Sequence, residues 1–138
     1  MAAAVEASKG IRGEVALPQF SAMMAEVLLI RGDLTAAEAC LTQAMDFEKS
    51  HDDAYFAAEV KRLSGVSLAR LGRTDDARTR LREAREIARA QGATMFELRS
   101  SLSLADVSAQ EGRVAARDVL ARFPEPEPWP EIVAAQAL

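Results

Sequence analysis

Apolar residues recur at every third or fourth position along most of this chain, which is the pattern of amphipathic helices. After Gly72, for example, the apolar stripe consists of Ala77, Leu81, Ala84 and Ala88, with charged residues elsewhere. No alternating run of β-branched residues is long enough to indicate a strand. The pattern predicts an all-α fold with helices over 18–31, 34–50, 53–71, 74–91, 94–111 and 114–123.

The apolar pattern also repeats with a period of forty residues, marked by Gly32, Gly72 and Gly112. A shift of forty places apolar residues on apolar residues: Leu28 on Leu68, Ala37 on Ala77, Leu41 on Leu81, Ala44 on Ala84 and Phe56 on Phe96. Glycine suits the position after a helix, where the backbone turns left-handed. We therefore expect each of the three glycines to end the first helix of a hairpin. Another helix start is predicted at Thr94, which has the capping-box spacing with Glu97.

Three regions follow from this pattern. Residues 1–14 are expected to form a partly ordered N-terminal segment, and residues 15–123 about three hairpins stacked as a helical-hairpin solenoid. Residues 124–138 begin with alternating prolines, which prevent a helix, and are expected to form a turn and a short C-terminal capping helix. In that segment Trp129, Ile132, Val133 and Leu138 would cover the open end of the stack.

Composition argues against several functional classes. The 138 residues carry a net charge of −4, and no stretch approaches the ~20 apolar residues of a membrane span. The single cysteine, Cys40, cannot form an internal disulfide, so we expect a cytoplasmic protein and a buried apolar role for this residue. His51, the only histidine, is followed by Asp52 and Asp53, which fits a polar turn better than a metal site. We expect no catalytic residues, no metal, no cofactor and no membrane partner.

Specific residues give the repeat a family resemblance. With Gly72 between the two helices of one hairpin, Gly65, Leu68, Ala77, Leu81 and Ala84 stand at the signature positions of the tetratricopeptide repeat. One copy earlier, Ala25, Leu28, Gly32, Ala37, Leu41 and Ala44 do the same. In the third copy Ala105 and Gly112 match, but Ser108 stands where a larger residue is usual. The chain thus resembles tetratricopeptide proteins, with a longer period than usual.

The phrases Leu17-Pro18-Gln19-Phe20 and Gln110-Glu111-Gly112-Arg113 extend the resemblance to one group within that family. They are similar to the C-terminal tetratricopeptide tail of bacterial signalling proteins that join a cyclase or a DNA-binding module to an ATPase. The resemblance implies a non-catalytic scaffold for protein–protein interaction, as part of or partner to a bacterial signalling or regulatory protein. No phosphate-binding Gly-rich loop ending in Lys-Ser or Lys-Thr is present.

The family also implies where a partner would bind. In tetratricopeptide stacks the first helix of each hairpin lines a concave groove, which here would contain Gln19, Glu26, Glu59, Arg62, Val66, Arg99, Leu102 and Asp106. This mixture of charged and apolar residues suits a protein segment or peptide with charged ends.

Two alternatives remain open at this point. Leu17, Phe20, Met23 and Met24 on the first hairpin could join two copies of the chain as a homo-oligomer. A stripe of arginines at helical spacing could bind nucleic acid, and it consists of Arg78, Arg82, Arg85 and Arg89. The stripe is the less favoured alternative, because Glu83 and Glu86 are interleaved with it and it contains no aromatic residue.

Overall fold

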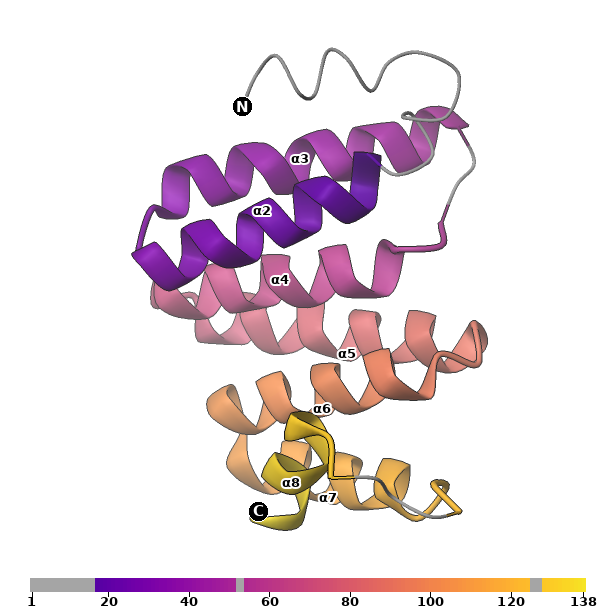
Figure 1. The fold of residues 1–138 in the computed structure, drawn as a ribbon. Helices are drawn as coiled ribbons and strands as arrows, with labels where there is room; N and C mark the ends of the chain where they lie inside the picture. Colours follow the sequence, from indigo (N-terminus) through magenta and orange to yellow (C-terminus); the bar gives the residue numbers. More distant parts are fainter. Residues whose placement is uncertain (1–16, 52–53, 125–127) are drawn as a thin grey trace.

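The computed structural model describes residues 17–51, 54–124 and 128–138, and these are mainly helical (Figure 1). The helices are α2 (Leu17–Arg31), α3 (Leu34–His51), α4 (Ala57–Arg70), α5 (Thr74–Ala90), α6 (Thr94–Val107), α7 (Ala109–Leu120) and α8 (Pro130–Gln136). No strand occurs within these residues, which confirms the predicted all-α class. The predicted N-terminal segment 1–14 lies outside them, as do Asp52 and Asp53.

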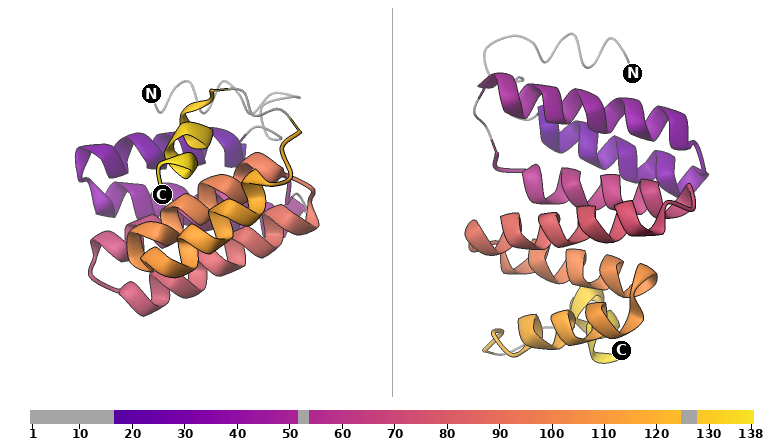
Figure 2. Two further views of the ribbon diagram at one scale, coloured as in Figure 1. Left: turned by 90° about the horizontal axis from the view of Figure 1, so that it is seen from below. Right: turned by 180° about the vertical axis from the view of Figure 1, so that it is seen from behind.

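The helices form three hairpins, α2 with α3, α4 with α5, and α6 with α7, stacked in one row (Figure 1). Seen from behind, the row runs from α2 and α3 at one end to α7 and α8 at the other (Figure 2). The helix α4 contacts α2 on one side and α6 on the other, in addition to its hairpin partner. The first helices of the three hairpins therefore lie side by side.

Gly32 and Gly72 have the role that the sequence predicts, with φ of +80° and +76°. At each turn two backbone N–H groups return to the helix: those of Gly32 and Asp33 donate to the carbonyls of Leu29 and Leu28, at 3.0 and 2.9 Å. This is the Schellman arrangement, which satisfies carbonyls that the helix end would leave unpaired. Gly92, with φ of +68°, makes the same turn between α5 and α6.

Gly112 departs from the prediction. The chain breaks earlier, at Ser108, where φ is −149° and ψ is 82°, and α7 begins at Ala109. Gly112 therefore lies inside α7, and a methyl group there would collide with the backbone N and Cα of Ala105 on α6. The predicted helices 94–111 and 114–123 are wrong at this junction, because this glycine serves a close helix approach and not a left-handed turn.

Small residues let the helices pack closely throughout the stack. Ala25, Ala37, Ala44, Ala77 and Ala84 are fully buried, and so are Leu41 and Leu81 at equivalent positions of the repeat. Cys40 lies at the edge of this core, half-buried, and burial raises the pKa of its thiol.

The C-terminal helix α8 packs against α6 and α7 (Figure 1). Ile132 and Ala135 are buried with Leu98 and Val119, and Leu138 lies against the same cluster. Trp129 and Val133 do not cover this end as predicted, because 54% and 52% of their surfaces are exposed. The helix α8 therefore does cap this end of the stack, but Ile132 is the side chain that anchors it, and not Trp129 or Val133.

Candidate functional site

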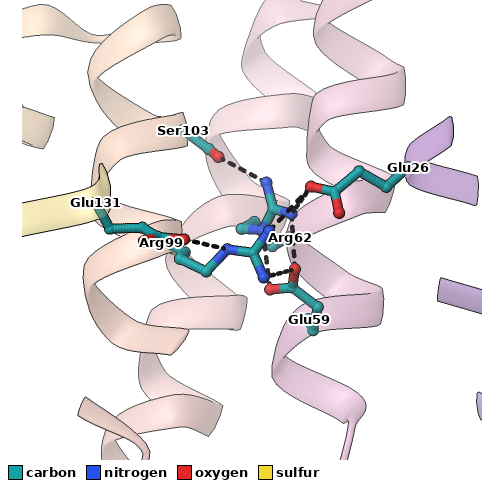
Figure 3. A network of polar contacts seen from close by, with 6 residues as sticks. All are labelled: Glu26, Glu59, Arg62, Arg99, Ser103 and Glu131. Carbon is teal, nitrogen blue, oxygen red and sulfur yellow. Dashed lines mark hydrogen bonds and ion pairs between the residues drawn. The ribbon is translucent and has the colours of Figure 1, made fainter. Parts of the chain in front are cut away.

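A network of charged side chains lies where α2, α4 and α6 meet, and Arg62 of α4 is its centre (Figure 3). Its guanidinium donates to Glu59 from Nε and Nη2, at 2.9 and 2.7 Å, and from Nη2 to Glu26 at 3.0 Å. Nη1 donates to the hydroxyl of Ser103 on α6, at 3.2 Å. Burial lowers the pKa of Arg62, but the hydrogen bonds and charges of Glu59 and Glu26 outweigh it and raise that pKa.

Arg99 of α6 extends the network to the C-terminal helix. Its guanidinium lies 2.7 Å from Glu59 and 2.9 Å from Glu26, and its Nε lies 3.6 Å from Glu131 of α8 (Figure 3). Four helices are thus joined by two arginines and three carboxylates. Glu59 and Arg62 are only 2% and 7% exposed, so they form the core of the network. The side chains of Glu26, Arg99 and Glu131 are 26–39% exposed and form its rim.

This geometry changes the groove predicted from the resemblance. Glu26, Glu59, Arg62 and Arg99 do come together, but they pair with one another, and the burial of Glu59 and Arg62 removes both from contact with a partner. The other predicted groove residues fall into two groups. Val66 and Leu102 are half-buried against the two apolar clusters, whereas Gln19 and Asp106 are exposed.

A second cluster surrounds Glu97 on α6, whose surface is 0% exposed. Arg89 donates to its Oε1 at 3.0 and 2.7 Å, Arg85 lies 4.0 Å away, and Arg122 hydrogen-bonds to Oε2. Burial raises the pKa of Glu97, but the hydrogen bonds from Arg122 and Arg89 outweigh it and leave that pKa below its ordinary value. Burial and the charge of Arg89 lower the pKa of Arg85. Glu97 therefore joins α5, the second helix of the middle hairpin, to α6, the first helix of the last hairpin.

Sequence reasoning missed this role of Glu97. Its spacing from Thr94 predicts a capping box, but the start of α6 has no side-chain cap. Three guanidinium groups compete for the same carboxylate, and charge-assisted hydrogen bonds are stronger than neutral ones. The sequence feature that could have indicated this ion cluster is the pair Arg85 and Arg89, which lie one turn apart near the end of the helix that precedes Glu97.

The arginine stripe is largely paired in the same way. Besides Arg85 and Arg89, Arg82 donates from Nε and Nη2 to Glu111 of α7 at 2.6 and 2.8 Å. Arg78 lies 3.5 Å from Asp75, whose side chain is 94% exposed. Three of the four arginines of the stripe, Arg82, Arg85 and Arg89, therefore face carboxylates of the next hairpin, which leaves less unpaired positive charge for the nucleic-acid alternative.

Other candidate chemistry is sparse. His51 is exposed, and its ring stacks on Phe47 with 3.9 Å between ring centres. Among the described residues no group of three or more His, Cys, Asp or Glu side chains could hold a metal ion. None of the described helices combines the length and the apolarity that a membrane crossing needs. A cleft of about 410 Å³ lies between α3, α4 and α5, but both of its arginines pair with carboxylates of the same cleft, Arg73 with Asp76 and Arg80 with Glu83.

Comparison with known proteins gives no match to a family model, to a curated protein or to a solved structure. The tetratricopeptide resemblance therefore stays a prediction from the sequence.

Proposed function

We propose that this chain is a non-catalytic scaffold of the tetratricopeptide kind, which binds a protein partner along the face formed by α2, α4 and α6. The observation that carries the proposal is the network of Arg62 and Arg99, which ties these three helices together. A face held in this way is preorganised, and binding then costs less conformational entropy.

The charges at this face favour a basic partner. Glu26, Glu59, Glu131 and Asp106 supply four carboxylates, against the two guanidiniums of Arg62 and Arg99. The excess of two negative charges, together with the net charge of −4, would attract a segment that carries lysine or arginine. Because Arg62 is buried, the partner would contact the rim.

Variants at Gln19 and Asp106 test this proposal, because both residues are exposed and lie outside the network. We would use the chain to capture partners from a bacterial lysate and identify them by quantitative mass spectrometry. The test variant is Gln19→Arg with Asp106→Arg. The matched control is Gln43→Arg with Asp46→Arg, which makes the same two substitutions at exposed positions of α3.

A basic protein captured by the parent chain and the control, but lost with the test variant, would support the proposal. Equal capture by all three chains would place binding elsewhere, provided that circular dichroism shows equal helix content. A variant such as Arg62→Glu is unsuitable here, because it would put a second carboxylate beside Glu59 in the buried core of the network.

A further inference from the structure

The forty-residue shift allows one face of the three first helices to be compared residue by residue. In α4 this face consists of Val60, Leu63 and Ser67, which are 0%, 2% and 1% exposed. In α6 the first two equivalent positions are Ser100 and Ser103, at 0% and 9%. In both hairpins the second helix of the preceding hairpin, α3 or α5, packs against the first helix. The face is therefore a packing surface within the stack.

In α2 the same positions hold Phe20, Met23 and Val27, which we call the outer face of α2. Their exposed fractions are 59%, 54% and 51%. One turn further along, Ile30 is 74% exposed. Among the equivalent positions of α2, α4 and α6, α2 therefore has large apolar side chains at every position, and these are the most exposed.

The remainder of α2 is also apolar. Ala22, Ala25 and Leu29 are buried against the neighbouring helices. Within Leu17–Arg31 the only charged residues are Glu26, which belongs to the network, and the terminal Arg31. A helix that is apolar on all sides is usually buried on all sides.

We propose that a second copy of this chain covers the outer face of α2, through a two-fold symmetric pairing of the two α2 helices. The surface at the opposite end of the stack indicates why two copies would pair through their α2 helices and not head to tail. There α8 packs over α6 and α7, and this end exposes Val114, Trp129 and Val133 but also the charged Arg117 and Asp118 of α7. Head-to-tail stacking would bring the uncharged outer face of α2 against these charges, whereas a two-fold contact pairs two apolar faces.

Charge and size are compatible with this pairing. The outer face of α2 carries no charged residue, so the two-fold contact brings no like charges together although each copy has a net charge of −4. A helix of 15 residues is about 22 Å long. The apolar patch is on the order of a few hundred Å², below the ~800 Å² per partner of a standard stable interface. We therefore expect a weak dimer, formed at roughly micromolar concentrations or above.

Sedimentation velocity of the full chain, from about 1 to about 200 μM, tests the proposal without any substitution. The expected result is a mass that rises with concentration from 14.9 kDa toward twice that value. A mass of 14.9 kDa at every concentration would overturn it.

Two matched variants locate the contact. Phe20→Glu with Met23→Glu should remain a monomer at every concentration. Val114→Glu with Val133→Glu also places two acids at exposed apolar positions, 48% and 52% exposed, but at the other end of the stack, and should dimerise like the parent chain. If both variants dimerise, or if neither does, the outer face of α2 is not the contact. This pairing does not depend on the proposed function, so the Gln19→Arg, Asp106→Arg variant should still dimerise.

Discussion

The two ion clusters of this molecule have opposite arrangements. Around Arg62 a buried cation is held by carboxylates of its own and neighbouring first helices, and only the rim of that cluster is exposed. Around Glu97 a buried anion is held by three arginines, of which Arg89 and Arg122 are 60% and 44% exposed in their side chains. Water can therefore reach Arg89 and Arg122 more easily than it can reach Glu59, the carboxylate that accepts two hydrogen bonds from Arg62. We therefore expect the loss of stability on removing either buried charge to depend on whether the partners left behind can be hydrated by water.

The largest effect should come from Arg62→Met. This change keeps most of the side-chain volume but leaves Glu59 buried with Arg99 as its remaining cation. Breaking a buried pair typically costs ~3–5 kcal/mol. We expect a loss in this range in the free energy of unfolding, measured by urea denaturation followed by circular dichroism. A loss below about 1 kcal/mol would mean that Arg99 alone can hold the cluster.

Glu97→Gln should be less costly, at about 2–3 kcal/mol, since the arginines it leaves are partly solvated and can be hydrated again. The same urea titration measures it. Double substitution with Arg89→Gln is the control: the second change should add little once the carboxylate is absent. Full additivity of the two losses would indicate that Arg89 acts through other contacts.

At acid pH the parent chain should lose its greater stability relative to the Glu97→Gln variant. The pKa of Glu97 is depressed in the folded protein below its ordinary value of 4.5, so its contribution to stability is present above that value and lost as pH falls through the folded pKa. The difference in unfolding free energy between the two chains should be constant from about pH 7 to 5.5 and shrink below about pH 4.5. A difference independent of pH down to the acid transition would contradict this assignment.

The smallest effect is expected at the rim. Glu131→Gln removes a contact of 3.6 Å to Arg99 from a side chain that is 28% exposed. Exposed pairs contribute roughly 0–1 kcal/mol, so the melting temperature should change little. Ile132→Ala is the matched comparison on the same helix, and it should lower the melting temperature clearly because this side chain is buried. Equal melting temperatures of these two variants would mean that α8 does not stabilise the stack.

Local sequence patterns predicted the helices and two of the hairpin glycines, because spacing along one helix determines both. They did not predict the junction at Gly112. A left-handed turn and a close helix contact both require glycine, and the residue type cannot distinguish them. The clusters were missed for a related reason. Arg62 meets Glu26 across 36 positions and Arg99 meets the same carboxylate across 73, whereas sequence reasoning weighs neighbours three or four positions apart.

The reach of Glu26 across 73 positions has a consequence for how the molecule comes apart. Stacks of similar helical units often unzip from one end, because each unit contacts only its neighbours. Here the first hairpin carries Glu26, which pairs with Arg62 of the second hairpin and Arg99 of the third. If the first hairpin unfolds, both guanidiniums lose this carboxylate. Fraying is thereby coupled along the whole stack. Hydrogen exchange should show α2, α4 and α6 opening together, as one cooperative unit, and not one after another.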